Sequence, residues 1–377
     1  MRIPLLNLTR LHNGLRKELN QAWDGILSAS SFILGEPVRE FETAVAHYHG
    51  MKHAVGVASG TDALILALQA LGAGPGCGVF TAPFTFVATA SSILRVGATP
   101  IFVDVEPDTF NLSVESFRRA LDSLPDGCPP AKAVIPVHLF GLSADMGPIL
   151  EIARERNLRV IEDVAQAFGA LYEGRKVGTL GDVGCFSFFP SKNLGGFGDG
   201  GMVITGSDEI ADTVSMLRQH GGRDKYHTDL LGYNSRLDAL QARLLSVKLP
   251  FIDQWNERRR KVAGLLSQGL QDIAEVTAPT IPSYAQSVFN QFTIRCRNRD
   301  ALEKHLQSRE IGSAIYYPKC LHEQPIFTNH CVRPVPLTHA EALTREVLSL
   351  PVDPLQTEEE TLAVVNAVRE FYRQAVT

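Results

Sequence analysis

The sequence has 377 residues, 45% of them hydrophobic and 20% charged, which is enough to bury a large core and to form two domains. A formal net charge of −5, with no basic stretch that stands out, argues against a nucleic-acid-binding protein. No segment reaches the length of a membrane span, and the first residues lack the apolar core of a signal peptide. We therefore expect a soluble, cytoplasmic protein that contacts neither membrane nor nucleic acid.

The six cysteines lack the paired spacing of a disulfide framework or a zinc site. Only the segment from Cys320 to Cys331, which includes His322 and His330, brings potential metal ligands close together in sequence. The adjacent His330-Cys331 pair is poorly suited to bind a single ion, so we expect no metal site and reduced thiols.

Strands and helices alternate through the first two thirds of the chain. Two helices are predicted first, over residues 11–27 and 37–48. Several of the strand-like segments that follow are continuous apolar runs, typical of a sheet covered on both faces. This pattern predicts an α/β fold with a seven-stranded, mostly parallel sheet and helices on both of its faces. The seven expected strands cover residues 53–59, 77–83, 99–105, 133–140, 158–164, 183–189 and 200–205.

The composition changes in the last third of the chain. A long helical pattern begins at Asn234 and is expected to kink at Pro250. We therefore predict a large domain over residues 1–250 and a small α+β domain over residues 251–377.

Within the predicted small domain, two later helices are announced by capping boxes that begin at Thr338 and Thr357, each followed three residues later by glutamate. The other elements expected there are strands over residues 288–296 and 313–317 and a helix over residues 301–308.

One lysine stands between the last two strands of the expected sheet. Lys192 follows the apolar strand that Pro190 closes, and it precedes a glycine-rich run over residues 195–201. An amine held there would be partly desolvated, which lowers its pKa and frees it to attack a carbonyl group. A surface lysine on a hairpin is the alternative, and the rest of the chain decides between the two.

The first strand runs directly into a helix through Ser59, Gly60 and Thr61. In open α/β sheets, ligands bind outside the carboxyl ends of the strands. Backbone N–H groups, the Thr61 hydroxyl and the positive end of the helix would together hold a phosphate group there. An ordinary helix cap would account for Ser59 or Thr61, but not for the glycine between them.

Two other strand ends carry side chains suited to a planar cofactor. The fifth strand ends in Glu162 and Asp163, and burying two adjacent acids is costly unless a cation meets one of them. Asp163 could pair with a protonated ring nitrogen, although capping or pairing with an arginine stays open. Phe86, which follows the second strand, could stack on a planar ring, and a place in the core is its alternative.

A phosphate cradle, a carboxylate for a ring nitrogen, a stacking aromatic ring and a buried lysine are what pyridoxal 5′-phosphate (PLP) requires. The lysine amine would bind the cofactor covalently. The carboxylate would keep the pyridine nitrogen protonated, so that the ring can withdraw electrons. We therefore expect a PLP-dependent enzyme.

Five motifs, in this order along the chain, resemble those of the DegT/StrS nucleotide-sugar aminotransferases, a group of fold-type-I PLP enzymes. The resemblance covers nearly the whole chain, and the motifs are specific in combination. They are Ser59-Gly-Thr-Asp-Ala-Leu, Pro83-Phe-Thr-Phe-Val-Ala-Thr, Glu162-Asp-Val-Ala-Gln-Ala-Phe-Gly-Ala, Ser187-Phe-Phe-Pro-Ser-Lys-Asn-Leu-Gly and Gly232-Tyr-Asn-Ser-Arg-Leu-Asp-Ala-Leu-Gln-Ala.

The resemblance implies a role for each matching residue around the cofactor ring. Lys192 would be the catalytic lysine that binds PLP, and Asp163 would meet the pyridine nitrogen. Gln166 would lie near the ring hydroxyl, and Phe86 would stack on the ring.

The resemblance also implies how the phosphate is held. Gly60, Thr61 and Ser187 would contact the phosphate within one subunit. Asn234 would reach the phosphate of the neighbouring subunit, so that a homodimer shares its active sites.

The activity implied is an aminotransferase that moves an amino group, with glutamate as the expected donor, to a keto sugar linked to a nucleotide. Lys192 would act as general acid and base once the donor amine has displaced it. Related sugar dehydratases carry histidine in place of the lysine, so Lys192 weighs against that activity. A non-catalytic regulatory protein on the same fold is the alternative from another class, and the intact Lys192, Asp163 and Gln166 argue against it.

The resemblance also bears on which sugar carbon receives the amine. Relatives that aminate C3 tend to carry Asn-Ser-Arg-Leu-Asp after a Lys-Tyr-His segment, and this chain has both, at residues 234–238 and 225–227. Sugar C4 aminotransferases more often show Asn-Tyr-Arg, so we predict amination at C3. The 225–227 segment could instead only pack the dimer interface. The side chains expected to contact the sugar are Lys225, Tyr226, His227, Tyr316 and Tyr317.

Overall fold

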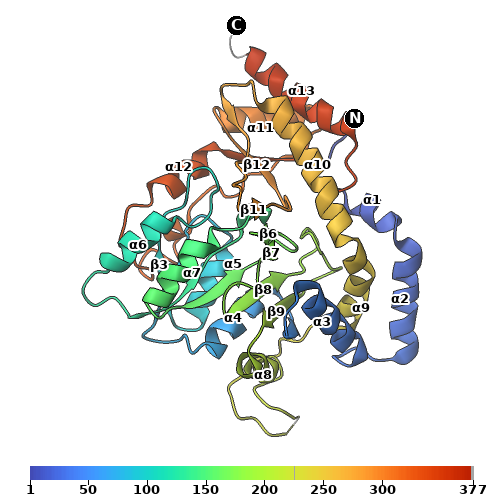
Figure 1. Cartoon of the computed structure of the whole chain (residues 1–377). Helices are drawn as coiled ribbons and strands as arrows, with labels where there is room; N and C mark the ends of the chain where they lie inside the picture. Colours follow the sequence, from blue (N-terminus) through green and yellow to red (C-terminus); the bar gives the residue numbers. More distant parts are fainter. Residues whose placement is uncertain (225, 375–377) are drawn as a thin grey trace.

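A seven-stranded sheet is the central element of the fold. The computed structural model describes residues 1–224 and 226–374 of the chain (Figure 1). The strand order is β1-β9-β8-β5-β4-β2-β3, and β9 runs antiparallel to both of its neighbours while the other six strands point the same way. The predicted fold class and all seven predicted strands are confirmed. The strands are β1 His53–Val57, β2 Gly78–Thr81, β3 Thr99–Phe102, β4 Ala131–Ile135, β5 Arg159–Asp163, β8 Val183–Ser187 and β9 Gly201–Thr205.

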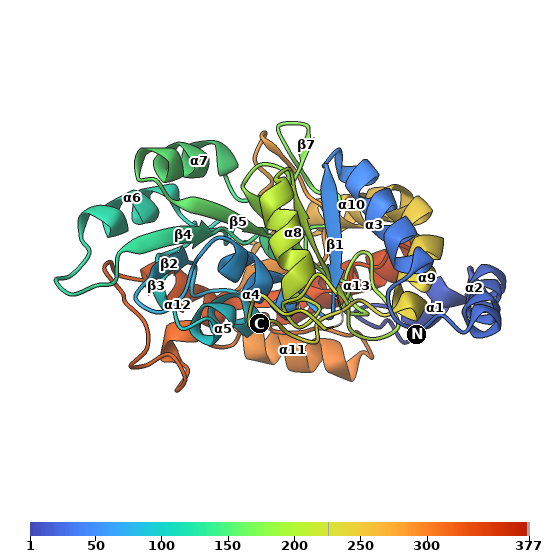
Figure 2. The same ribbon diagram turned by 90° about the horizontal axis from the view of Figure 1, so that it is seen from below.

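Helices cover both faces of the sheet (Figure 2). Side chains that alternate along the strands fill the two layers between sheet and helices. Phe80 of β2 packs on one face, whereas its neighbour Val79 packs on the other. The first face is covered by α3 (Glu36–His49), α6 (Val114–Asp122) and α7 (Met146–Glu155). The second is covered by α4 (Gly60–Ala70), α5 (Val87–Arg95) and α8 (Asp208–Leu217).

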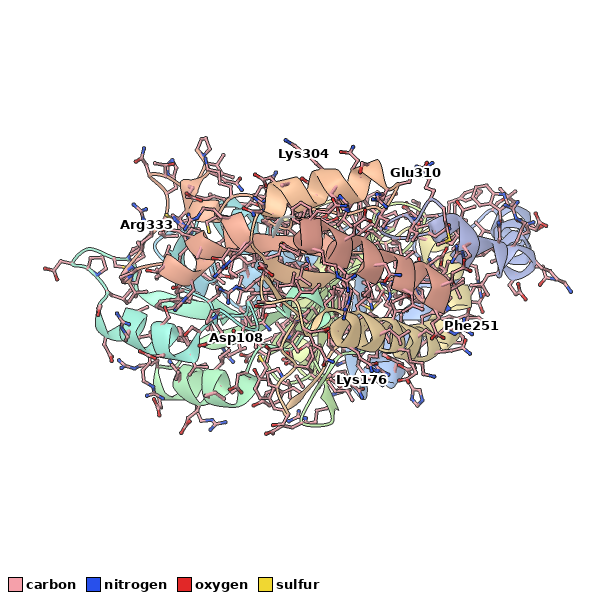
Figure 3. The ribbon with its side chains drawn as sticks, turned by 90° about the horizontal axis from the view of Figure 1, so that it is seen from above. Asp108, Lys176, Phe251, Lys304, Glu310 and Arg333 are labelled. Atoms are coloured by element: carbon pink, nitrogen blue, oxygen red, sulfur yellow. The ribbon has the colours of Figure 1, made fainter. Side chains whose placement is uncertain are left out.

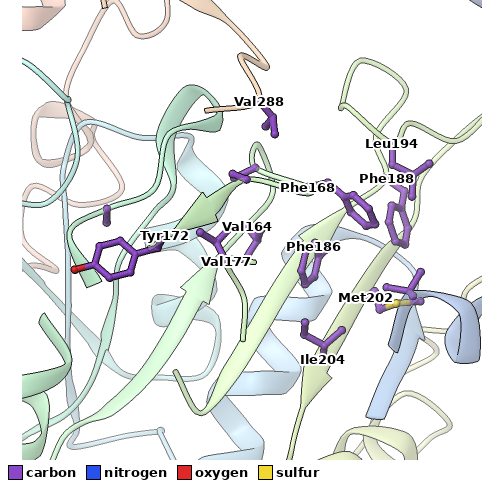
Figure 4. Packing of buried hydrophobic residues seen from close by; sticks show 14 of the residues in the cluster. Val164, Phe168, Tyr172, Val177, Phe186, Phe188, Leu194, Met202, Ile204 and Val288 are labelled. Carbon is purple, nitrogen blue, oxygen red and sulfur yellow. The ribbon is translucent and has the colours of Figure 1, made fainter. Parts of the chain in front are cut away.

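Two aromatic residues at the carboxyl end of β8 belong to the first layer, Phe186 in the strand and Phe188 just after it (Figure 4). Phe168 lies against both, with ring centroids 5.5 Å from Phe186 and 6.4 Å from Phe188. Strand β8 is therefore held from the core side, and its carboxyl end is a rigid starting point for the loop that follows.

The predicted first helix is two helices, α1 (Leu8–Asn13) and α2 (Arg16–Ala29). The break falls at Leu15, whose backbone is not helical (φ −118°, ψ 13°) although its side chain is buried in the core. The second predicted helix is confirmed as α3.

The C-terminal third forms a second hydrophobic core around a three-stranded sheet, β10 (Val276–Thr277), β12 (Phe292–Cys296) and β13 (Val347–Leu350). Figure 3 looks down on this unit, where Lys304 and Glu310 mark the outer edge and Phe251 marks one end of α10. The helices are α9 Ala239–Lys248, α10 Ile252–Leu270, α11 Arg299–Ser308, α12 Thr338–Glu346 and α13 Glu358–Gln374. The remaining short elements are β6 Leu171–Tyr172, β7 Arg175–Lys176, β11 Ala285–Gln286, η1 Leu139–Gly141, η2 Leu249–Phe251 and η3 Leu321–Glu323.

Two local predictions in this third are wrong, and each has a physical reason. Residues 313–317 make only one isolated bridge, Ala314 to Ser349, because Tyr316 and Tyr317 pack against a cluster on the large sheet instead. Thr338 does not cap α12, because the carboxylate of Asp104 accepts hydrogen bonds from the first N–H groups of that helix.

Other local predictions in this third hold. The helix predicted over residues 301–308 is present as α11. The capping box at Thr357 is formed with Glu360, at 2.8 Å and 3.1 Å, and it begins α13.

The beginning of the chain is fastened to this C-terminal unit. Ile3 bridges Ile311, and the Asn7 N–H donates to the carboxylate of Asp353 over 2.7 Å. Arg10 forms a two-pronged ion pair with Glu360, at 2.6 Å and 2.9 Å. Among the described residues no helix is long and apolar enough to cross a membrane, and the six cysteines are free thiols.

We predict that Gly60→Ala destabilises the apoprotein, because a methyl group at Gly60 would lie 2.6 Å from the Cβ of Ser187. Relieving such a clash between two packed backbones costs about 1–3 kcal/mol. The control is Gly264→Ala, in the interior of α10, where a methyl group meets no atom within 4 Å. That change should raise stability by up to about 1 kcal/mol, because alanine favours helix. Thermal midpoints measured on both variants test the prediction, and equal midpoints would contradict it.

Candidate active site

Lys192 lies on a turn just beyond the carboxyl end of β8, as predicted. Its backbone N–H donates to the Phe189 carbonyl over 2.9 Å, which closes the turn. The side chain is half-buried, and its Nζ forms no hydrogen bond or ion pair with another described residue. Burial lowers the pKa of Lys192 to about 8, although the negative charge of Asp163 acts in the opposite direction. The alternative of an ordinary surface lysine is therefore wrong, since this amine is poorly solvated.

Asp163 ends β5 and is 4% exposed. Its carboxylate accepts hydrogen bonds from the Thr89 hydroxyl (2.8 Å) and from the Ala165 N–H (3.1 Å). No lysine, arginine or histidine among the described residues forms an ion pair with it. Burial raises the pKa of Asp163 above its usual value, against the opposing effect of these two hydrogen bonds. The pairing with an arginine that the sequence left open is thus not made.

Glu162, one residue earlier, has a structural role. Its carboxylate is fully buried and accepts hydrogen bonds from His138 Nε2 (2.9 Å) and from the backbone N–H groups of residues 178, 180 and 181, each at 2.7 Å. The Ala144 N–H donates to His138 Nδ1, so the ring proton is on Nε2 and points at Glu162. Although burial opposes ionisation, these donors together lower the pKa of Glu162.

Gln166 and the predicted aromatic residues meet Tyr317 in front of Asp163. Gln166 is buried, accepts a hydrogen bond from the Phe140 N–H (2.6 Å) and donates to the Tyr317 hydroxyl (3.0 Å). The Phe86 ring is 6.5 Å from that of Tyr317, and Phe86 is 56% exposed. The core alternative for Phe86 is therefore wrong, and its ring is available to stack on a ligand.

The predicted phosphate cradle is assembled from the ends of β1 and β8. Ser59 caps α4 by accepting a hydrogen bond from the Asp62 N–H (3.1 Å), which places Gly60 and Thr61 in the first turn of the helix. Gly60 lies against Ser187 so closely that a side chain would not fit. N–H groups at the positive end of a helix, beside two hydroxyl groups, favour an anion.

Several predicted residues do not join this cluster within one subunit. The side chains of Tyr226 (82% exposed) and His227 extend from the loop after α8, and His227 Nδ1 lies 2.9 Å from an Asp224 oxygen. Lys225 lies outside the described residues. Asn234 is exposed, and α9 begins only at Ala239, so the prediction that the long helix starts at Asn234 is wrong.

Tyr316 is the remaining predicted contact. It is half-buried beside Tyr317, with 5.9 Å between ring centroids. The structure therefore brings together Lys192, Asp163, Gln166, Phe86 and Tyr317, with Tyr316 next to them.

Sequence reasoning missed two residues that hold the site. Thr89 is on the first turn of α5, three residues after Phe86, and that helical spacing was a usable signal. His138 had no such signal, because its partner Glu162 comes from a different strand.

The residues present fit PLP. The buried carboxylate of Asp163 needs a cation, and a protonated pyridine nitrogen is one. The partly desolvated amine of Lys192 needs an electrophile, and the PLP aldehyde is one. The first turn of α4 fits the phosphate.

Residues 13–369 match the DegT/DnrJ/EryC1/StrS aminotransferase family. The chain belongs to this family. The aminotransferase is 45% identical over 377 residues to a pleiotropic regulatory protein of Geobacillus stearothermophilus, with 99% of each chain covered. It is also 45% identical to a UDP-N-acetyl-3-dehydro-alpha-D-glucosamine 3-aminotransferase of Acidithiobacillus ferrooxidans, with 97% of each chain covered.

Among solved structures, S. venezuelae DesV in complex with a ketimine intermediate is 39% identical to the aminotransferase. The TM-score is 0.94, and 98% of each chain is covered. The cofactor of the aminotransferase is PLP.

We predict that the apo-aminotransferase binds PLP covalently at a rate that rises with pH, is half-maximal near pH 8 and levels off about one pH unit higher, because only the neutral amine attacks and burial lowers the pKa of Lys192 to about 8. With an ordinary lysine, the rate would level off about two pH units higher. Stopped-flow absorbance on the apoprotein, with N-acetyl-lysine as control, measures this profile.

In the same experiment Asp163→Asn should move the plateau to lower pH, because the charge of Asp163 raises the pKa of Lys192. A wild-type rate still rising through pH 9.5 would contradict the prediction.

Proposed function

We propose that this aminotransferase transfers an amino group from glutamate to C3 of a nucleotide-linked 3-keto sugar. The observation that carries the proposal is the half-buried amine of Lys192, which forms no hydrogen bond with another described residue, near the buried carboxylate of Asp163, which forms no ion pair with one. The 45% identity to a sugar-nucleotide 3-aminotransferase supports C3.

Two residues would carry the chemistry. PLP, when bound, supplies an aldehyde that condenses with amines and a ring that withdraws electrons from the neighbouring carbon. Asp163 holds a proton on the ring nitrogen, because a buried carboxylate is stabilised by a cation. Lys192 would bind the cofactor and, once free, would hold and move a proton at its Nζ as general base and then general acid.

Other residues would orient the cofactor and the sugar and would exclude water from the site. Phe86 would stack on the cofactor ring, and Gln166 would contact the ring hydroxyl from the position it holds beside Tyr317. Gly60, Thr61 and Ser187 bind the phosphate. Tyr316 and Tyr317 close the site from the C-terminal unit and contact the sugar, which fixes the ketone at about 3–3.5 Å from the attacking nitrogen.

We predict that the pyridoxamine form of the enzyme converts 3-keto sugar nucleotides and leaves 4-keto sugar nucleotides unchanged, because choosing C3 or C4 requires the hexose to shift by one carbon in the site. Loss of the pyridoxamine absorbance with a panel of both classes measures this. Conversion of 4-keto compounds alone would overturn the C3 assignment and keep the aminotransferase.

Lys192→Ala is the variant that tests the site itself. It should lose turnover and retain PLP bound without a covalent bond, because the ring and phosphate contacts lie elsewhere. Substantial transaminase activity in this variant would overturn the assignment of Lys192. A wild-type protein that neither binds PLP nor reacts with glutamate would favour the regulatory alternative, which the name of the Geobacillus relative raises.

We also propose that the enzyme is a homodimer with shared active sites. Asn234 and the 225–227 segment would serve the neighbouring subunit, Asn234 at the phosphate and Lys225, Tyr226 and His227 at the sugar. The exposure of Tyr226 and Asn234 supports this, as do large exposed apolar side chains nearby, such as Leu231.

Mixing two inactive variants tests whether the two subunits share their active sites. An Asn234→Ala subunit and a Lys192→Ala subunit should regain part of the wild-type activity after subunit exchange, because a mixed dimer then has one site with neither lesion. Activity of the mixture and mass spectrometry of the exchanged dimer are measured together. Proven exchange with no recovery would contradict a shared site.

Two coarser proposals complete the description. We place the division between a large domain (1–250) and a small α+β domain (251–377) at the start of α10. We also propose that the enzyme works in the cytoplasm, a reducing compartment suited to six free thiols.

A further inference from the structure

A second buried lysine lies close to the loop that follows Lys192. Lys248, at the end of α9, is 1% exposed, and no carboxylate among the described residues forms an ion pair with it. A buried ammonium group is costly unless its donors are matched, so its retention calls for an explanation.

The partners of Lys248 come from the loop and from the first helix. Its Nζ donates a hydrogen bond to the carbonyl of Gly195 and lies 3.4 Å from His12 Nε2. Burial, with a smaller effect from the charge of Lys248, lowers the pKa of His12 to about 4, so the imidazole is neutral and accepts. The ring of Phe197 lies against His12, with 4.4 Å between the ring centroids and the planes tilted by 34°, and its centroid is 5.2 Å from the Lys248 Nζ.

The carbonyl that Lys248 holds belongs to a tightly folded loop. The Gly196 N–H donates to the Phe188 carbonyl (2.7 Å), so the chain returns to the end of β8 after passing through Lys192. Gly195 is pressed against Pro190, where an added methyl group would lie 2.2 Å from the carbonyl oxygen. Leu194 is anchored in the core beside Phe188 (Figure 4).

Helices α9 and α10 supply the other anchors of this loop. Gln241, seven residues before Lys248, accepts a hydrogen bond from the Phe197 N–H (2.8 Å). Asn193 donates to Asn256 (2.7 Å). Lys248 is the one charged anchor among these, and it acts three residues from Lys192.

We propose that Lys248 is a positioning residue for Lys192: its ammonium group holds the Gly195 carbonyl and so fixes the turn from which Lys192 reaches the cofactor. His12 completes the ammonium's contacts, which ties helix α1 to the loop. The inference rests on the proposed role of Lys192. Lys248 is 1% exposed and its Nζ donates to the Gly195 carbonyl, so in this proposal it forms no bond with the cofactor.

The test is Lys248→Met, which keeps the length of the side chain and removes the donor. Apoprotein is mixed with PLP, the absorbance of attachment is followed, and the adduct is trapped with borohydride and located by mass spectrometry. We expect attachment and kcat for the glutamate half-reaction to fall about tenfold, as displacement of a reacting group by less than 1 Å does, with KM changed less than twofold. The adduct should stay on Lys192.

The thermal midpoint separates positioning from a merely structural role. Replacing a buried charge by an apolar side chain is often neutral or stabilising, so the midpoint should hold or rise while attachment slows. Lys261→Met, at an exposed position on α10, is the matched control and should change neither the thermal midpoint nor the rate of PLP attachment. A folded Lys248→Met protein with wild-type attachment and kcat, or a wild-type adduct on Lys248, would overturn the proposal.

His12 provides a second route if Lys248→Met does not fold. His12→Phe keeps a ring against Phe197 and removes the acceptor, so attachment should slow about threefold, whereas His12→Gln keeps an acceptor and should behave as wild type. Equal rates in the two variants would overturn the proposal. Covalent trapping of PLP by Lys192→Ala would instead refute the proposed site, so the two failures are distinguishable.

Discussion

A buried carboxylate that forms no ion pair with any described residue is the constraint on which the site depends. Asp163 is desolvated and is oriented by Thr89 and Ala165, so a cationic group of a ligand beside it would offset the cost of burying its charge. The parallel strands direct their carboxyl ends to one edge, where Lys192 and the first turn of α4 meet this charge. Cofactor binding and stability of this aminotransferase are therefore linked, because PLP supplies what Asp163 lacks.

Side chains alternate between the two faces of a strand, so the neighbouring residues Glu162 and Asp163 have different roles. Glu162 points into the layer below, where four donors satisfy it, and it fixes the loop over residues 178–181 against β5. Asp163 points to the other face and is left for the ligand. The hydrogen bonds of Glu162 hold the strand in register, so the Asp163 side chain keeps its direction when the cofactor is absent.

The sequence predicted the sheet and the ring-binding residues because both depend on local signals: apolar runs broken by turns, and polar side chains directly after them. It could not predict the contacts made across the fold. Asp104 replaces Thr338 as the cap of α12, and Lys248 reaches Gly195, because chain folding brings together residues far apart in sequence. The prediction of a helix from Asn234 was wrong for a related reason. The Ser235 hydroxyl donates to Asp62 (2.7 Å) and helps hold the segment before α9 in a non-helical conformation.

The fastening of the first helix to the end of the chain has a consequence for synthesis. Asn7 and its partner Asp353 are 346 residues apart, and Arg10 and Glu360 are 350 residues apart. The strands of the large sheet can pair long before those partners leave the ribosome, since all seven lie before residue 206. The contacts of Asn7 and Arg10 must then wait until translation is nearly complete. An interrupted chain would carry a formed sheet and an unfastened first helix, which is the kind of segment that chaperones and proteases recognise.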